Sequence, residues 1–182
     1  MSRRKNDFYP TPTWATELLI RSVPIYGGIL ECCAGDGAIA NVLETMSEVV
    51  VWRNDIDETM PRLNSTKDAS NPLHFYQMTE HGVVSWVVSN PPFSHAPQII
   101  PLAYKNAAIG IAMLLRLSFL EPVENRGAWL NEHPPTQLIV LPRISFTGNG
   151  KTDSVTCAWM VWQKTAKGQQ IIIAKNPKFG GR

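Results

Sequence analysis

Residues 28–37 read GILECCAGDG, an apolar run that passes through an acid and ends in two closely spaced glycines. Gly28 to Cys33 has the length and composition of a short buried strand, and Gly35 to Gly37 has those of a tight turn. Ala38 to Met46 follows with the apolar spacing of a helix. A strand, a glycine turn and a helix in this order are typical of a parallel α/β sheet.

The same alternation continues on both sides of this stretch. Helices are predicted at Thr13 to Val23, with Thr13 as the cap, at Pro97 to Ala108 and at Asn125 to Glu132. Further strands are predicted at Val49 to Arg53, His74 to Gln77, Val83 to Ser89, Ile109 to Leu115, Leu138 to Leu141 and Thr156 to Gln163, and Gln170 to Ala174 could add an edge strand. We therefore expect a doubly wound, seven-stranded, mostly parallel sheet with helices on both faces. In such sheets ligands bind beyond the carboxyl ends of the strands.

The composition is that of one globular domain. The chain has 182 residues, of which 44% are hydrophobic and 18% charged, and no linker divides it, so we expect a single domain over 1–182. No apolar run reaches the roughly 18 residues of a membrane span, and none follows the basic N-terminus as in a secretory signal. Three cysteines without a CxxC spacing indicate neither a disulfide framework nor a metal site. We expect a cytoplasmic protein without membrane contact.

Charge is distributed unevenly along the chain. The net charge is +2, but residues 1–5 and 154–182 carry eight basic residues and no acidic one. Residues 6–153 therefore carry nine basic residues and fifteen acidic ones. The middle of the chain is therefore acidic and its ends are basic. We expect the ends, 1–6 and 175–182, to be flexible, and they serve either as solubilising tails or as arms that touch a polyanion.

The first candidate site is the glycine turn with the acid that precedes it. Gly35 and Gly37 remove side chains where a backbone must approach a ligand, and the next helix points its N-terminus at the same place. A plain strand-to-helix turn has the same composition. Glu31 changes the interpretation, because a carboxylate disfavours phosphate and favours a cationic ligand such as a sulfonium amino acid.

A second group of acids follows the next strand. Asp55 comes 20 residues after Gly35, the position from which an acid accepts hydrogen bonds from ribose hydroxyls. Ile56 could pack on an adenine face, and Asp68 could accept from the adenine amino group. The alternatives are a surface turn around Asp55 and an ordinary loop carboxylate at Asp68.

The third candidate is Asn90-Pro91-Pro92-Phe93, directly after the strand that ends at Ser89. Two prolines make the backbone rigid and remove two N–H donors. The Asn90 side-chain oxygen and the nearby carbonyls can then hold an –NH2 group by both hydrogens, while Phe93 offers a flat face to a planar group. The alternative is a rigid turn with a buried phenylalanine.

A fourth segment, 142–148, carries Phe146 and leads into the flexible Gly148 to Gly150. Phe146 is either a second aromatic wall for the same planar group or part of the core.

Together these segments resemble the class I S-adenosylmethionine-dependent methyltransferases, which have a Rossmann-like fold, and within them the DNA methyltransferases that modify amino groups. Asn90 to Phe93 matches their catalytic motif (N/D/S)PP(Y/F), in the Asn form usual for N6-adenine enzymes. Glu31 to Gly37 is similar to the first cofactor motif, and Asp55 and Asp68 match the acids of the next two.

Two further segments extend the resemblance over about residues 8–163. Tyr9-Pro10-Thr11-Pro12 resembles the N-terminal motif that contacts the methionine end of the cofactor, and Arg143 to Gly148 with 158–162 resembles the motif near the C-terminal end. This motif order is that of the γ group. No insertion is long enough for a separate target-recognition domain, so the chain resembles a small phage-like member whose sequence readout comes from short loops, a second subunit or nothing.

The resemblance implies that S-adenosyl-L-methionine is the methyl donor and that the acceptor is the N6 amino group of a flipped-out adenine in DNA. It implies catalytic roles for Asn90, Pro91, Pro92 and Phe93, and stacking of the base on Phe93 and Phe146. The residues that it implies for the cofactor are Tyr9, Pro10, Thr11, Glu31, Ala34, Gly35, Asp36, Gly37, Asp55, Ile56, Asp68 and Asn90.

Other functions of the same fold stay open. The substrate could be adenine in RNA, N4 of cytosine in DNA, or a protein glutamine amide, which also presents a planar –NH2 group. From another class, the chain could be a non-catalytic partner subunit, although intact Glu31, Asp55 and Asn90 argue against it. The oligomeric state, a dimer included, is also open.

Overall fold

The computed structural model describes residues 10–80, 82–144 and 155–175. The described strands form one seven-stranded sheet in the order β2-β1-β3-β4-β6-β5-β7. They are β1 (Gly27–Glu31), β2 (Val49–Arg53), β3 (Trp86–Ser89), β4 (Gly110–Arg116), β5 (Gln137–Val140), β6 (Cys157–Gln163) and β7 (Gln170–Ile173). The predicted doubly wound, mostly parallel α/β sheet is confirmed.

The strand directions identify the ligand edge of the sheet. β1 pairs in parallel with β2 and β3, and β3 with β4, whereas β6 runs antiparallel to β4 and β5. The chain passes from β1 to β2 on one side, and β3 then pairs with the other side of β1. A crevice forms beyond the carboxyl ends of the strands at such a reversal of strand order. The ends of β1, β2 and β3 therefore meet at the place where a ligand is expected.

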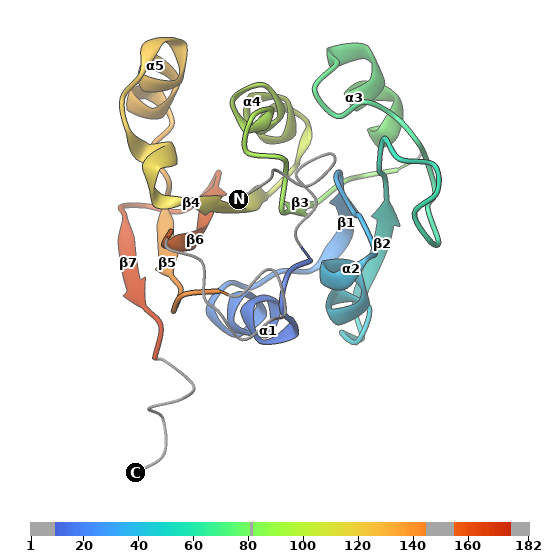
Figure 1. Cartoon of the computed structure of the whole chain (residues 1–182), viewed down its shortest axis with the longest axis horizontal. Coiled ribbons are helices and arrows are strands. Elements are labelled where there is room, and N and C mark those ends of the chain that lie inside the picture. The colour runs from blue at the N-terminus through green and yellow to red at the C-terminus, as the bar shows by residue number, and fades with distance from the viewer. Residues whose placement is uncertain (1–9, 81, 145–154, 176–182) are drawn as a thin grey trace.

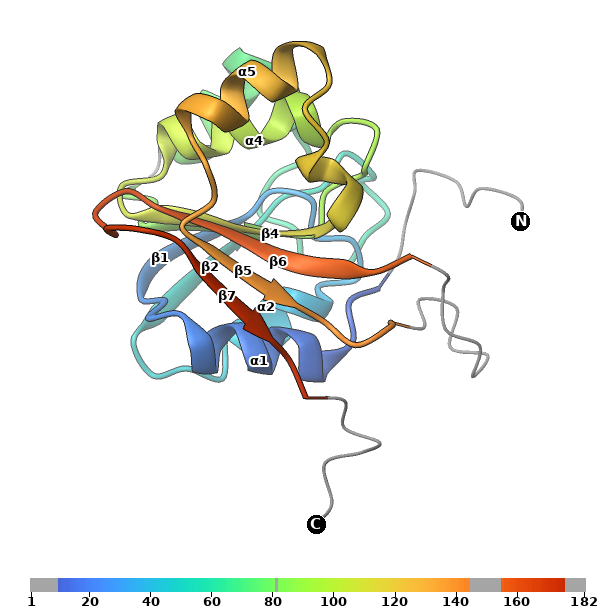
Figure 2. The ribbon, with the colours of Figure 1, turned by 90° about the vertical axis from the view of Figure 1, so that its left-hand side faces the viewer.

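Helices cover both faces of the sheet (Figure 1). One face carries α1 (Thr13–Ser22) and α2 (Ala38–Leu43), and the other carries α3 (Pro72–Thr79), α4 (Ala96–Asn106) and α5 (Glu124–Glu132). A short 3-10 helix, η2 (Leu117–Leu120), directly follows β4. Figure 2 shows the sheet from the side, between the two helical layers. Each layer buries its own apolar cluster against the sheet.

Tryptophans lie in both apolar clusters. Trp86, Trp159 and Trp162 are at most 1% exposed. A buried indole N–H needs an acceptor, and here Trp159 Nε1 donates to the Ala15 carbonyl over 2.8 Å, which fastens α1 to β6. No helix in the described part of the chain is long and apolar enough to cross a membrane.

Two local predictions are wrong. His74 to Gln77 is not a strand but the middle of α3, because Asn71 Oδ1 accepts from the backbone N–H of Leu73 and His74 and Pro72 occupies the first turn. The seventh strand is instead β7, the edge strand. Thr13 is the first residue of α1 rather than its cap; Pro12 holds the cap position without a side-chain hydrogen bond.

Candidate functional site

The side chain of Asp55 joins the glycine turn to the end of β2. Its Oδ2 accepts the backbone N–H of Gly35 over 2.8 Å, and its Oδ1 accepts that of Asp57 over 2.9 Å. A carboxylate offers about four lone pairs, so both oxygens can accept further hydrogen bonds from a ligand. Asp55 is half-buried, at the position expected for an acceptor of ribose hydroxyls.

The glycine turn needs its glycines for geometric reasons. Gly35 has φ 52° and Gly37 has φ 79°, in the left-handed region that favours glycine. A Cβ on Gly37 would also collide with the guanidinium of Arg53. Ala34 is 5% exposed and donates its N–H to the Asn54 carbonyl over 2.8 Å. The turn is therefore held tightly against the end of β2.

Asn54 is a site residue that the sequence analysis missed. It is fully buried, and its Nδ2 donates to the carbonyls of Cys32 and Lys67, each over 2.9 Å. Its Oδ1 accepts from Ser65 Oγ over 2.7 Å and from the Lys67 N–H over 2.8 Å. One amide thus ties the end of β1 to the loop that carries Asp68. The sequence feature that could have identified Asn54 is its position directly before Asp55 at the end of the strand.

Asp68 lies at the far end of that loop. Its Oδ1 accepts from the hydroxyl of Ser70 over 2.6 Å and from the Ser70 N–H over 2.9 Å. These hydrogen bonds hold the pKa of Asp68 below its ordinary value, and the nearby imidazoles of His74 and His95 lower it further. Since His95 precedes α4, the loop approaches the Asn90 segment.

The Asn90 segment is linked to both the N-terminal segment and the glycine turn. Asn90 Nδ2 donates to Thr11 Oγ1 over 3.2 Å, although the two residues are 79 positions apart. Ser89 Oγ accepts the Cys33 N–H over 3.2 Å. Beyond the prolines, the Pro92 carbonyl accepts the N–H groups of His95 and Ala96, each over 2.9 Å, which begins α4. The structure thus brings together three segments that the sequence singles out separately.

Phe93 meets an arginine that the sequence did not pair with it. The guanidinium carbon of Arg116, the last residue of β4, lies 4.4 Å from the centroid of the Phe93 ring. Phe93 is half-buried and Arg116 is exposed, so an aromatic face and a cation share the rim of the site. The expected second wall, Phe146, lies outside the described residues, and so does Tyr9; the neighbouring Pro10 is half-buried.

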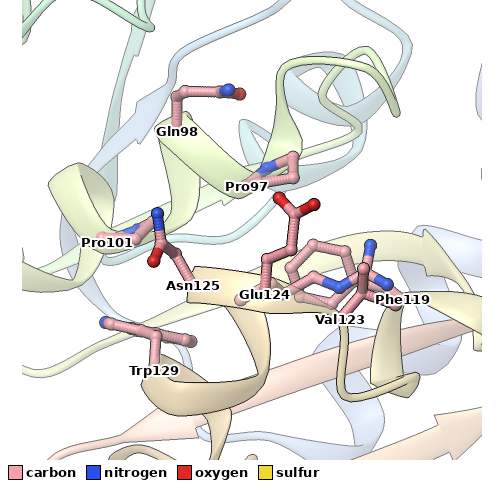
Figure 3. A pocket seen from close by; sticks show the side chains of 9 residues that line it. Pro97, Gln98, Pro101, Phe119, Val123, Glu124, Asn125 and Trp129 are labelled. Atoms are coloured by element: carbon pink, nitrogen blue, oxygen red, sulfur yellow. The ribbon is translucent and has the colours of Figure 1, made fainter.

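Two cavities lie on the α3–α4–α5 side of the sheet. The larger, about 510 Å³, lies between α4 and the segment from Phe119 to Trp129 (Figure 3). The smaller, about 250 Å³, lies between β2 and α3, and Asn64, Ser65 and Lys67 of the Asn54-bonded loop line it. In the described part of the chain no three His, Cys, Asp or Glu side chains are grouped to hold a metal ion.

Glu31 does not lie at the mouth of the turn. It is 1% exposed, and its Oε2 accepts the Ala40 N–H of α2 over 2.9 Å. Burial raises the pKa of Glu31 well above its ordinary value, although the Ala40 hydrogen bond and the charge of Arg53 act in the opposite direction. Its carboxyl lies behind the glycine turn, and its expected contact with a cationic ligand stays a prediction.

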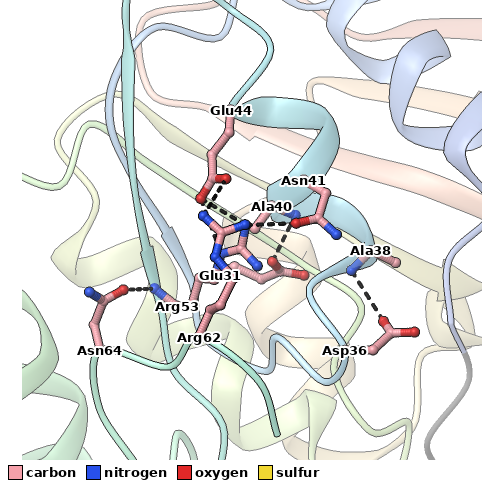
Figure 4. Close-up of polar contacts among 9 residues, drawn as sticks. All are labelled: Glu31, Asp36, Ala38, Ala40, Asn41, Glu44, Arg53, Arg62 and Asn64. Carbon is pink, nitrogen blue, oxygen red and sulfur yellow. Dashed lines mark hydrogen bonds and ion pairs between the residues drawn. The ribbon is translucent and has the colours of Figure 1, made fainter.

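Arg53 anchors the polar network around Glu31 (Figure 4). Its side chain is 3% exposed, forms an ion pair with Glu44 over 2.8 Å and donates to Asn41 Oδ1 over 2.8 Å.

Two other predicted residues lie outward on the rim: Asp36 is exposed, and Ile56 is 62% exposed. An apolar side chain this exposed beside Asp55 could cover one face of a planar ligand.

No protein-family model and no curated protein matches the chain. Several solved structures share its fold. A protein of Pyrococcus horikoshii assigned as an RNA methyltransferase is 14% identical with a TM-score of 0.67, over 91% of this chain and 93% of that one. A protein of Agrobacterium tumefaciens assigned as an O-methyltransferase is 14% identical with a TM-score of 0.61, over 90% and 86% of the two chains.

A third structure, from Listeria monocytogenes, is assigned as a class I S-adenosylmethionine-dependent methyltransferase. It is 13% identical with a TM-score of 0.57, over 89% of this chain and 62% of that one. At these identities the likeness is one of fold. The chain therefore has the Rossmann-like fold that these proteins share.

Proposed function

We propose that the chain transfers a methyl group from S-adenosylmethionine to the N6 amino group of adenine in DNA. The observation that carries the proposal is the placement of Asn90-Pro91-Pro92-Phe93. This segment leaves β3 at the switch point of the sheet, with Asn90 hydrogen-bonded to Thr11 and Ser89 bonded to the glycine turn. The shared fold with proteins assigned as methyltransferases supports the same conclusion.

The acceptor groups and the apolar side chain at the strand ends fit this cofactor. The Asp55 carboxylate suits the two hydroxyls of a ribose, the exposed Ile56 suits an adenine face, and Gly35 leaves room above the backbone. Asp68 keeps its charge because Ser70 hydrogen bonds lower its pKa, so it can accept from an amino group. When bound, S-adenosylmethionine supplies the methyl group from a sulfonium cation.

The chain itself positions the acceptor nitrogen. The Asn90 side-chain oxygen and the Pro91 carbonyl would accept the two hydrogens of the target –NH2, which directs the nitrogen lone pair toward the glycine turn. The same acceptors stabilise positive charge as it develops on nitrogen. The proton then leaves to water. Phe93 stacks on the flipped-out base, a contact worth roughly 1–3 kcal/mol.

DNA is the proposed partner because of charge and stacking. Residues 1–5 and 154–182 carry lysines and arginines and no acidic residue, and Arg116 adds an exposed cation beside Phe93. A glutamine amide needs neither a polyanion contact nor an aromatic platform. RNA is the second candidate, since the Pyrococcus horikoshii protein of the same fold is assigned as an RNA methyltransferase.

The test is a product analysis. The purified chain is incubated with S-adenosylmethionine and unmethylated DNA or RNA, and each is digested to nucleosides for mass spectrometry, with Asn90→Ala as the control. N6-methyladenine from DNA with the wild type alone is the expected result. Modified nucleosides from RNA alone would make RNA the substrate. Cofactor binding without any modified nucleoside would favour a protein amide over a nucleic-acid substrate, or point to a missing partner subunit.

A further inference from the structure

We infer that the groove between α4 and α5 holds the nucleobase that neighbours the methylated one in an unpaired strand. The inference rests on the proposed function, because it assigns the groove to the same nucleic acid. At about 510 Å³ the groove is within the range of ligand pockets, roughly 300–1,000 Å³. Its apolar walls are Pro97, Pro101, Phe119, Val123 and Trp129.

Both walls of the groove start at the candidate site. α4 begins at Ala96, three residues after Phe93, and η2 begins directly after Arg116. Phe93 and Arg116 are themselves in contact. The groove therefore opens between two elements that diverge from this pair. A strand whose target base lies on Phe93 brings its next nucleotide to the mouth of the groove.

The contact between an arginine and a phenylalanine is repeated inside the groove. The Arg126 guanidinium carbon lies 5.2 Å from the centroid of the Phe119 ring. Two hydrogen bonds from Arg126 to the Glu121 carbonyl, over 3.2 and 3.0 Å, hold it there. Phe119 itself is only 7% exposed, so the surface that a base would meet is the planar guanidinium of Arg126 lying over it. Unpaired bases stack on arginine guanidinium planes as well as on aromatic rings.

The polar residues select a base rather than a phosphate. Figure 3 shows the carboxylate of Glu124 pointing toward Pro97 and the side chain of Asn125 lying on the Pro101 side of the groove. A carboxylate repels phosphate but accepts from an exocyclic amino group, and an asparagine amide pairs with an adjacent donor and acceptor. Adenine, cytosine and guanine all carry an exocyclic amino group, whereas thymine has none. Glu124 also has φ 46°, a strained value for a non-glycine residue of the kind that gathers at ligand sites.

The inference gives the fold itself a means of reading sequence. A groove on the methyltransferase fold itself would select the flanking base. It predicts that a neighbouring base with an exocyclic amino group is preferred over thymine.

The test measures binding and methylation on the same probes. Short fluorescein-labelled single-stranded oligodeoxynucleotides carry one target adenine, and each neighbour is varied among the four bases or made abasic. Affinity is measured by fluorescence anisotropy with the full chain. Glu124→Ala and Asn125→Ala are compared with Glu132→Ala and Asn131→Ala, which are exposed on the same helix outside the groove.

An abasic neighbour is expected to weaken binding to the wild type about tenfold. Glu124→Ala and Asn125→Ala should reduce the preference among the neighbours to within about twofold, while the two control variants keep it. Equal affinity for the abasic probe, or an unchanged preference in the groove variants, would overturn the inference. Methyl transfer to the same probes tests the proposed function separately. Asn90→Ala should abolish methyl transfer, while its binding affinity should still depend on the neighbouring base.

Discussion

The side-chain nitrogen of Asn90 donates a hydrogen bond to Thr11 Oγ1 over 3.2 Å. It connects the segment after β3 to the segment before α1, 79 residues earlier, and Thr11 is only 5% exposed. In this hydrogen bond the amide nitrogen of Asn90, rather than its amide oxygen, points at Thr11. Thr11 thereby sets which way the amide oxygen of Asn90 faces, which makes it a positioning residue for the proposed transfer.

Thr11→Val should lower kcat about fivefold and leave KM for DNA nearly unchanged, because it removes one hydrogen bond without changing the shape of the side chain. Steady-state kinetics measure both constants. Thr11→Ser keeps the hydroxyl and should restore kcat. If Thr11→Ser is as slow as Thr11→Val although it keeps the hydroxyl, the hydrogen bond to Asn90 does not set kcat and the positioning role is wrong.

Asp55→Ala should weaken the binding of S-adenosylmethionine at least tenfold, since it removes a charged acceptor and also releases the N–H of Gly35. Isothermal titration calorimetry gives the dissociation constant. Glu58→Ala, which is exposed on the same loop, is the matched control and should bind normally. An unchanged dissociation constant in Asp55→Ala would refute the assigned contact.

Glu31 makes the stability of the protein depend on pH. Its pKa is raised by burial in the folded state, whereas an unfolded glutamate titrates at about 4.3, so the folded state binds the proton more tightly. Its contribution to stability is complete below that unfolded value and is lost as the pH rises through the folded pKa. Glu31→Gln stays neutral, and its free energy of unfolding should fall less with pH over this range.

Urea denaturation at a series of pH values measures this effect. Asp68 is the internal contrast, because its lowered pKa contributes stability above its unfolded value and loses it as the pH falls through the folded one. Parallel pH profiles for the wild type and Glu31→Gln would show that Glu31 titrates as an ordinary carboxyl.

Asn54→Ala should lower the free energy of unfolding by about 2–4 kcal/mol. It leaves the buried carbonyl of Cys32 and the backbone of Lys67 without their partner. Chemical denaturation at neutral pH measures the loss. Asn131→Ala, exposed on α5, should change stability by no more than about 0.5 kcal/mol. A small loss in Asn54→Ala would mean that the loop is held by other contacts.

Much of the fold follows from local pattern. β2 occupies Val49–Arg53 as predicted, and the positions after β1, β2 and β3 are those that the sequence singled out. His74 to Gln77 was misassigned because its aromatic residues suit a strand, while the Asn71–Pro72 helix start has the greater effect. Periodicity over four residues cannot distinguish a strand from a short helix.

The contacts of the site depend on chain segments far apart in the sequence. Nothing near Phe93 indicates that Arg116 covers its ring, and nothing near Asp68 indicates that Asn54 holds its loop. Glu31 has the spacing of an acid at the mouth of the turn, but its side chain turns inward to the Ala40 N–H. That contact exists only where α2 packs against the sheet.

The sequence by itself determined the α/β class, the glycine turn and the order of chemistry-bearing segments, because strand length, turn residues and apolar spacing act over a few neighbouring residues. Only the tertiary structure decided that Asn90 meets Thr11, that Arg116 meets Phe93 and that α4 and α5 enclose a groove. Those relationships arise when the parallel strands align their carboxyl ends, and that alignment is a property of the whole sheet.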